Sequence, residues 1–432
     1  MQGVLQFKVI ASITEKIERQ LGFRFSAIHN CNQSRLDLKC KLKNKKMAYI
    51  LLPHSPSDTV LDRGSIKLLD TPSDDDQVTM WNVIKSAFGS PRHKSLSSLI
   101  DLFATYRKQV WSGVSSYSIQ SMEEEEFYLE NATQELDLDG ELLHCVKELV
   151  CLLPEMFPSG QVVLCTSLES QHVELTRLQM ACLNACLLLG VIRPKKAQIF
   201  KKWIGFDTSI REWTHKNSQS SSTYLAMFSN YLKLVYKHWR LNPKHEYFDQ
   251  IIAVKRVKRE RSTVVNLMNQ FSDIPLCPVD FRTCRMEQVS DCSVSAVFSN
   301  KNIGPGSYST QEEVVFGSYN ELLPVSMLCS TMGDEEVIVV KGAQQIFPNL
   351  TSQLTFTERR HIVLDSNAEF GTNFPPTCPQ MTFLFMDAIP FDTEVHLVES
   401  SDECIWREIT KAYTAFSYVE NENIITGFWG CG

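Results

Sequence analysis

The sequence lacks the features that mark several large classes of protein. Its 14 cysteines include no CxxC pair and no paired Cys or His spacing, which argues against a zinc site. The longest apolar run, residues 180–192, contains Asn184 and is too short to cross a bilayer. The N-terminus has Lys8 within its apolar stretch and no small-residue cleavage site. We therefore expect no metal, no membrane partner and no secretory signal peptide.

An excess of positive charge is also missing. The chain has 43 Lys and Arg against 50 Asp and Glu, a net charge of -7, so direct DNA binding is not expected. Hydrophobic residues make up 43% and charged residues 22%, which is typical of soluble globular proteins. Cys182 and Cys186 lie within an apolar helical pattern and are expected to be core residues of a reduced, intracellular protein.

The pattern along the chain divides its 432 residues into three parts. Residues 1–75 form an N-terminal appendage that ends in the polar, acidic linker DTPSDDDQ. Residues 76–270 repeat apolar positions with helical spacing and predict a mainly helical accessory domain. Within it, Thr176 and Gln179 have the spacing of a capping box and predict a helix start.

A basic run, VKRVKRER at residues 254–261, permits three interpretations. It has the composition of a nuclear-import signal and of a contact for a phosphate polymer. It is also compatible with the solvated face of a helix. The sequence leaves these alternatives open.

After residue 270 the pattern changes to short runs rich in valine, isoleucine and phenylalanine, which alternate with helical stretches. This predicts an α/β fold with a largely buried sheet. We expect one sheet that contains all four of the strand-like runs, which are VSAVF, EVIVV, HIVLD and TFLFMD.

The stretch NIGPGSYSTQEE, residues 302–313, has two interpretations. It is compatible with a Gly-Pro-Gly turn before a helix that Thr310 caps and Glu313 closes as a capping box. A glycine loop before a helix start also exposes N–H groups that favour an anion such as a diphosphate. Glu312 and Glu313 point roughly 100° apart at ~3.6 residues per turn, so they cannot flank one glycosidic bond as a pair. One could protonate a leaving oxygen while the other holds a sugar hydroxyl, and mutual repulsion would raise one pKa.

Several motifs, in order, make the chain resemble the poly(ADP-ribose) glycohydrolase family, whose signature is a Gly-Gly-Gly loop followed by Gln-Glu-Glu. Gln311, Glu312 and Glu313 match the signature, and Phe298 and Asn300 match the strand that enters the loop. Further matching segments are NELLPVSML, DAIPF, REITKAYTAF, TGFWGCG and, more weakly, LTRLQMACLNACLLLG.

The resemblance implies a macrodomain-like mixed sheet with flanking helices over residues 271–432, and hydrolysis of ribose–ribose bonds in poly(ADP-ribose). Glu313 would protonate the leaving ribose oxygen and Glu312 would hold ribose hydroxyls, with no metal or cofactor. The implied partners are poly(ADP-ribose) or ADP-ribosylated proteins, in the nucleus, the cytoplasm or both. The implied substrate-binding residues are Asn300, Gly304, Gly306, Gln311, Gly430 and Gly432.

The sequence also departs from the family pattern. Pro305 interrupts the glycine triplet and removes an N–H, and four residues, 307–310, make a shorter link to Gln311 than in the family. Val297 replaces an aspartate, the segment KGAQQIFPNLTSQ has Phe347 but no tyrosine, and the chain ends within the second glycine loop. Two hypotheses follow: a divergent glycohydrolase with an apparently truncated core, or a catalytically impaired relative that serves as an ADP-ribose reader or scaffold.

Overall fold

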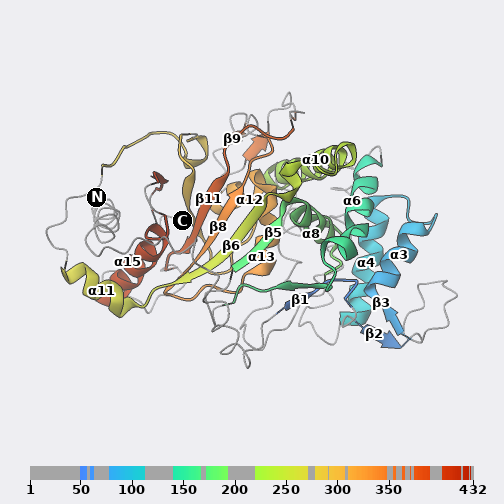
Figure 1. Cartoon of the computed structure of the whole chain (residues 1–432), viewed down its shortest axis with the longest axis horizontal. Helices are drawn as coiled ribbons and strands as arrows, with labels where there is room; N and C mark the ends of the chain where they lie inside the picture. The colour runs from blue at the N-terminus through green and yellow to red at the C-terminus, as the bar shows by residue number, and fades with distance from the viewer. Residues whose placement is uncertain are drawn as a thin grey trace.

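The computed structural model in Figure 1 shows an elongated molecule with a central sheet and helices at both ends. Of the N-terminal appendage, the structure describes residues 49–55 and 59–62, which include the strands β1 (Tyr49–Leu51) and β2 (Thr59–Asp62). The structure describes residues 49–55, 59–62, 77–111, 140–166, 172–192, 219–270, 278–289, 291–306, 310–347, 354–356, 362–364, 370, 374–389, 401–419, 422–427 and 429.

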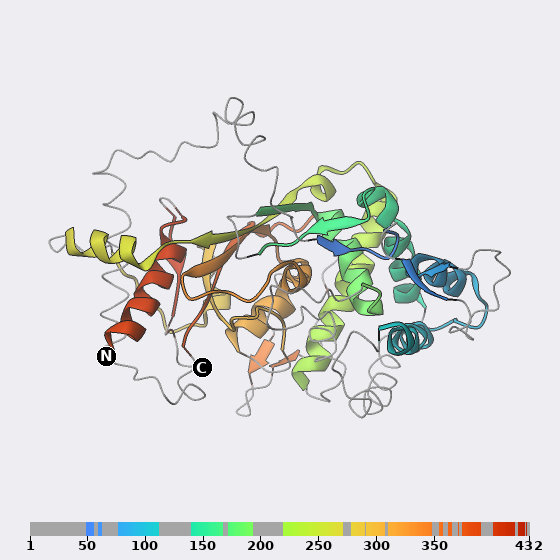
Figure 2. The same ribbon diagram turned by 90° about the horizontal axis from the view of Figure 1, so that it is seen from below.

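Two antiparallel pairs of short strands open the described chain. β1 (Tyr49–Leu51) pairs with β4 (Gln161–Val163), and β2 (Thr59–Asp62) pairs with β3 (Gln77–Thr79). In Figure 2, β2, β3 and the first helices lie at the end of the molecule opposite α15 (Asp402–Phe416).

Six described helices lie within residues 76–241, and the assignment of residues 76–270 to a separate helical domain stays a prediction. α8 is at their centre: all but one of its residues are buried, and Thr176 and Gln179 form the predicted capping box. The helices are α3 (Met80–Gly89), α4 (Leu96–Trp111), α6 (Glu141–Cys151), α7 (Leu153–Met156), α8 (Arg177–Leu189) and α10 (Gln219–Leu241).

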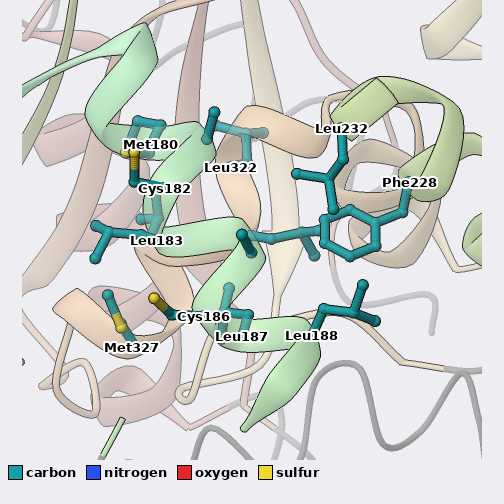
Figure 3. Close-up of a cluster of buried hydrophobic side chains, with 14 of the residues drawn as sticks. Met180, Cys182, Leu183, Cys186, Leu187, Leu188, Phe228, Leu232, Leu322 and Met327 are labelled. Atoms are coloured by element: carbon teal, nitrogen blue, oxygen red, sulfur yellow. The ribbon is translucent and has the colours of Figure 1, made fainter. Parts of the chain in front are cut away.

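Figure 3 shows why α8 is buried on every side. Its leucines and cysteines pack against Phe228 and Leu232 of α10 and against Leu322 and Met327, which belong to the α/β part of the chain. Cys182 and Cys186 are core residues, as predicted. The helical region and the sheet region therefore share one hydrophobic core.

A six-stranded mixed sheet carries the candidate site. Its order is β12-β7-β11-β8-β6-β5. The first three strands in this order run parallel to one another, and the remaining pairs are antiparallel. The bounds are β5 (His172–Thr176), β6 (Ile251–Lys258), β7 (Val294–Ser299), β8 (Glu336–Ala343), β11 (Met381–Asp387) and β12 (Ile424–Ile425).

One expectation about the strands was wrong, and one of the alternatives left open for the basic run is excluded. HIVLD is not part of the main sheet, because β10 (Ile362–Leu364) pairs only with β9 (Leu354–Phe356) in a separate sheet. The basic run does not form a helix face, because residues 254–258 belong to β6 and alternate between buried and exposed positions. The division at residue 270/271 stays a prediction, although β5 and β6 bring two strands into the sheet from before it.

The two faces of the sheet are covered by different helices. On one face, Phe385 of β11 lies 5.6 Å from Phe316 of α12 (Gln311–Ser318), measured between ring centroids. On the other face, Leu384 packs in a second hydrophobic cluster with Phe416 of α15. α11 (Arg261–Gln270) joins that second layer. The remaining described helical segments are η4 (Glu246–Asp249), η5 (Met286–Gln288), η6 (Asn320–Leu322) and α13 (Leu323–Leu328).

Over the residues described, no helix combines the length and apolar character needed to cross a membrane. Nor does any group of three or more His, Cys, Asp or Glu side chains in that part of the chain have an arrangement suited to a metal ion.

Candidate active site

The candidate site lies where the parallel strands β7 and β11 end. Ser299 and Asp387, their last residues, are register partners, so both strands reach the same edge of the sheet. A loop then leads to Thr310, the N-cap of α12. Ligands of open α/β sheets bind beyond the carboxyl ends of the strands, where loops and helix starts gather. The predicted strand, loop and helix start are therefore confirmed in this order.

Gln311 fixes the start of α12 to β7. Its side-chain oxygen accepts a hydrogen bond from the N–H of Phe298 at 2.8 Å, and its amide nitrogen donates to the carbonyl of Ala296 at 2.7 Å. These two hydrogen bonds occupy the backbone groups that a neighbouring strand would bond, and they hold the start of α12 against the edge of β7. The proposed contact of Gln311 with substrate stays a prediction, and the structure gives its side chain a positioning role.

Glu312 is buried and faces the loop. Its two carboxyl oxygens accept hydrogen bonds from the N–H groups of Asn300, at 3.0 Å, and Gly304, at 2.9 Å. Burial raises the pKa of Glu312 to about 8, and the two N–H groups oppose this shift without cancelling it. The neighbouring charges of Glu313 and Asp387 raise the pKa of Glu312 further. Glu312 therefore retains a proton at neutral pH.

Glu313 closes the helix start and reaches the same loop. One carboxyl oxygen accepts from the N–H of Thr310 at 2.9 Å, which is the predicted capping contact. The other oxygen lies against Gly306, so closely that a Cβ at position 306 would overlap it. The turn-and-cap interpretation and the functional one are thus both compatible with the structure. The carboxyl of Glu312 contacts Gly304 and that of Glu313 contacts Gly306, so both face the Gly-Pro-Gly loop.

The loop differs from a cradle of free N–H groups. The N–H of Gly304 is bonded to Glu312, and Pro305 has none to offer. Val297 is buried in the core below the loop. Residues 307–309, Gly430 and Gly432 lie outside the described residues. Gly427, in the second glycine segment, lies beside β7: a Cβ there would lie 3.5 Å from the ring of Phe298.

Asp387 is a buried acid at the same edge, and the sequence analysis gave it no role. Its carboxylate accepts from Arg407 at 2.5 Å and from Lys411, both on α15. Arg407 also donates to the backbone carbonyl of Asp387 at 2.6 Å. The signal for this contact was the spacing of Arg407 and Lys411, which is i, i+4 and places both on one helix face.

Arg256, in the basic run, is buried and organises a neighbouring loop. It donates to Glu336 at 2.7 Å and to the side chain and carbonyl of Ser330 at 2.9 and 2.5 Å. The next loop residues contact the Gly-Pro-Gly loop, through Thr331 with Asn302 at 2.5 Å. Because Arg256 is buried, the interpretation of the basic run as a contact for polymer or an import receptor is wrong for this residue. The exposed members of the run remain candidates.

A second buried ion pair joins α8 to the segment that follows α12. Arg177 donates to Glu321 of η6 and, at 2.7 Å, to the carbonyl of Gly342 of β8. Glu321 also accepts from the N–H of Gln344 at 2.9 Å. The pair therefore fixes the C-terminal side of α12 to the helical region, as Gln311 fixes its start to β7.

The comparisons with known proteins agree with this geometry. Residues 267–432 match a family model described as "Poly (ADP-ribose) glycohydrolase (PARG), Macro domain fold". A search of curated proteins gave no match. The α/β part of the chain is thus a macro domain. More narrowly, residues 267–432 are similar to the poly(ADP-ribose) glycohydrolase family, and the loop, Gln311 and both glutamates lie within the match.

Proposed function

We propose that this protein hydrolyses the ribose–ribose O-glycosidic bonds of poly(ADP-ribose) and releases ADP-ribose. The observation that carries the proposal is the pair of buried carboxyls at the first turn of α12, both against one loop, within the family match. A buried carboxyl that keeps its proton at neutral pH is the group that glycoside hydrolysis needs as an acid.

The chemistry proceeds through an oxocarbenium-like transition state. A proton passes from the glutamate pair to the leaving ribose oxygen as the C1–O bond breaks. Water then adds to the ribosyl carbon, and the pair takes back one proton, so one water is consumed for each bond. Glu313 is the member that faces the substrate, since one of its oxygens lies on the glycine loop.

Glu312 supports this step from a deeper position. Its exposed fraction is 5%, against 8% for Glu313, and each of its oxygens already accepts one backbone N–H. Once its proton has left, the remaining lone pair on each oxygen can accept a ribose hydroxyl. Because its raised pKa keeps a proton on Glu312 at neutral pH, Glu312 also stores the proton that is delivered.

The test compares the purified full chain with a Glu313→Gln variant on poly(ADP-ribose), measuring released ADP-ribose by chromatography. Glutamine keeps the shape but supplies no proton, so we expect release to fall by about 10²–10⁴-fold with binding retained. Glu403→Gln is the matched control, because Glu403 also lies in the first turn of a helix but is exposed. This control should cleave at the wild-type rate.

Three other outcomes would overturn the proposal. Equal release by wild type and Glu313→Gln would remove the glutamate from the chemistry. Binding of the polymer by both proteins without cleavage by either would indicate a reader. Absence of binding by wild type would leave a structural role for the macro domain.

A further inference from the structure

Two cysteines far apart in the sequence are direct neighbours in the fold. Cys165 lies two residues after β4, and Cys329 is the C-cap of α13. Both are thiols, and their exposed fractions are 0% and 5%. They are partners in a parallel β-bridge: the N–H of Cys165 donates to the carbonyl of Leu328 at 2.7 Å, and the N–H of Ser330 donates to the carbonyl of Cys165 at 3.3 Å. Backbone hydrogen bonds therefore hold the two residues side by side.

The bridge gives the two side chains the geometry for a disulfide. Partners in neighbouring strands lie about 4.8 Å apart, and their side chains point to the same side. Disulfides join residues whose Cα atoms are roughly 4.4–6.8 Å apart. The side chain of Cys329 is also hydrogen-bonded to the sulfur of Cys165, so the two sulfurs already meet. Closure of an S–S bond therefore needs rotation of two side chains and no rearrangement of the bridge.

Arg256 makes Cys165 the more reactive of the two thiols. Its guanidinium is buried and donates to the carbonyl of Cys165 at 3.2 Å. Glu336 and Ser330 accept from its two terminal nitrogens, whereas its Nε–H has no oxygen or nitrogen acceptor among the residues that the structure describes. A buried N–H without such an acceptor is available to a thiolate sulfur.

The acidities of the two thiols differ in the same sense. The hydrogen bond from Cys329 holds the pKa of Cys165 below its ordinary value, burial opposes this shift, and the charge of Arg256 supports it. The pKa of Cys329 lies well above its ordinary value, because burial disfavours its thiolate. The thiolate is the form of cysteine that attacks an oxidant, so Cys165 is the attacking member of the pair.

We propose that Cys165 and Cys329 are an oxidation site, at which hydrogen peroxide converts the two thiols to a disulfide. The sulfur of Cys165 attacks one peroxide oxygen, the O–O bond breaks, and the hydroxide that leaves takes up the thiol proton as water. Cys165 is then a sulfenic acid. Cys329 gives up its proton, its sulfur forms the S–S bond, and the hydroxyl of the sulfenic acid leaves as a second water. The two sulfurs lose two electrons in total, and hydrogen peroxide gains them.

The oxidation site lies behind the loop that holds the glutamate pair. Three residues after Cys329, the N–H of Met332 donates to the carbonyl of Lys301 at 2.8 Å. Three residues after Lys301, the N–H of Gly304 donates to Glu312. A bond at Cys329 ties this chain of contacts to the segment after β4. The oxidation stands on the bridge and the thiols alone, and only its effect on ADP-ribose release rests on the proposed function.

The experiment maps disulfides in the purified, reduced full chain after exposure to hydrogen peroxide. Remaining thiols are blocked with N-ethylmaleimide as the protein is unfolded, and peptides from a digest without reductant are identified by mass spectrometry. We expect a peptide pair joined through Cys165 and Cys329, which dithiothreitol separates. The exposed Cys151 and Cys284 report that the peroxide dose was sufficient to oxidise a thiol.

Serine variants test which thiol attacks. In Cys329→Ser, Cys165 has no thiol to resolve it, so its sulfenic acid should persist and react with dimedone. In Cys165→Ser, Cys329 should stay a thiol. Cys182→Ser/Cys186→Ser is the matched control, because these two cysteines are also buried, one turn apart on α8, and it should form the Cys165–Cys329 bond as wild type does. Near-ultraviolet circular dichroism establishes folding for each variant.

The inference is overturned if Cys165 and Cys329 both remain thiols at a dose that oxidises Cys151 and Cys284. It is also overturned if each of the two joins other cysteines as often as its bridge partner, or if dimedone labels Cys329 in Cys165→Ser. If a serine variant does not fold, the peptide map of wild type decides the question by itself.

The rate of ADP-ribose release provides the second readout. Oxidised wild type should release ADP-ribose at least roughly 10-fold more slowly, because a misplacement of ~1 Å can cost about 100-fold, and dithiothreitol should restore the rate. Cys165→Ser/Cys329→Ser should not respond to peroxide. If the disulfide forms but reduced wild type releases no ADP-ribose, the proposed function fails and the oxidation site stands. If release is unchanged by the disulfide, only the link to the loop fails.

Discussion

Gly306 and Glu313 touch in a way that leaves no room for a side chain at position 306. A Cβ built there would overlap Oε1 of Glu313 and lie 2.8 Å from its carboxyl carbon. This contact places the carboxyl of Glu313 by shape, since the loop backbone forms the wall against which it rests. The glycine is thus required by closeness to the acid, independently of any phosphate.

We predict that Gly306→Ala displaces the Glu313 carboxyl. A shift of about 1 Å can reduce a rate by 100-fold, so ADP-ribose release should fall by at least that factor. Gly304→Ala is the folding control, because its Cβ would meet Ser326 at an ordinary 3.5 Å. Equal thermal midpoints for the two variants, with release unchanged in Gly306→Ala, would show that the contact does not position the acid.

The raised pKa of Glu312 predicts a pH dependence of stability. Between its ordinary value of 4.5 and about 8, the folded protein binds a proton that the unfolded chain has released. The free energy of unfolding should therefore decrease as pH rises through this window, by at most ~1.4 kcal/mol per pH unit. Urea unfolding at a series of pH values should show this slope in wild type and a flatter one in Glu312→Gln. Parallel curves would contradict it.

The Arg177–Glu321 pair should contribute to stability as a coupled unit. Arg177→Met or Glu321→Gln alone leaves a buried partner without compensation, which costs about 3–5 kcal/mol. The double variant removes both charges and should be less destabilised than the sum of the singles. Denaturant unfolding of the four proteins gives the coupling energy. Strict additivity would mean that the ion pair does not act as a unit.

The basic run should separate into one structural member and several surface members. Arg256→Met is expected to lower the free energy of unfolding by about 3–5 kcal/mol, because Glu336 stays buried without a partner. Lys255→Met, at the next position, removes a half-exposed lysine that lies over Tyr418 and should cost under 1 kcal/mol.

Nuclear localisation or polymer binding is then tested on the flanking lysines alone. Glutamine at Lys255 and Lys258 should shift localisation, or weaken polymer binding and its dependence on salt, without unfolding the protein. A protein that keeps its location and its binding after this change would use neither lysine as a signal. If Arg256 were replaced together with Lys255 and Lys258, a loss of binding or a change of location could result from unfolding.

Local patterns predicted the parts of the fold that local contacts determine. The capping contacts of Thr176 with Gln179 and of Thr310 with Glu313 span three residues, so the sequence displays them directly. The four strand-like runs were also correct as strands. HIVLD was assigned to the wrong sheet, because strand propensity contains no information about which strand is the partner.

The remaining errors involve partners distant in the chain. Arg256 occupies a core position in β6 because Glu336, 80 residues away, balances its charge. A buried guanidinium needs such a partner, and the sequence around Arg256 does not show it. Asp387 and Lys411 were overlooked for the same reason, although both stood inside quoted motifs. Glu312 and Glu313 were identified because they are adjacent in the sequence.

The order of strands in the sheet has a consequence for how the chain folds while it is being synthesised. Of the six strands, β5 and β6 are translated first, and they can pair antiparallel once the segment with α8 and α10 between them has been made. The edge of β6 that pairs with β8 in the folded protein stays unpaired until residues 259–335 and then β8 have been translated. During this interval an unpaired strand edge with apolar alternate residues is open to other chains. Until β8 is translated, Arg256 of β6 has no Glu336 to pair with. Its unpaired charge on the core face of β6 discourages association with other chains before β8 pairs.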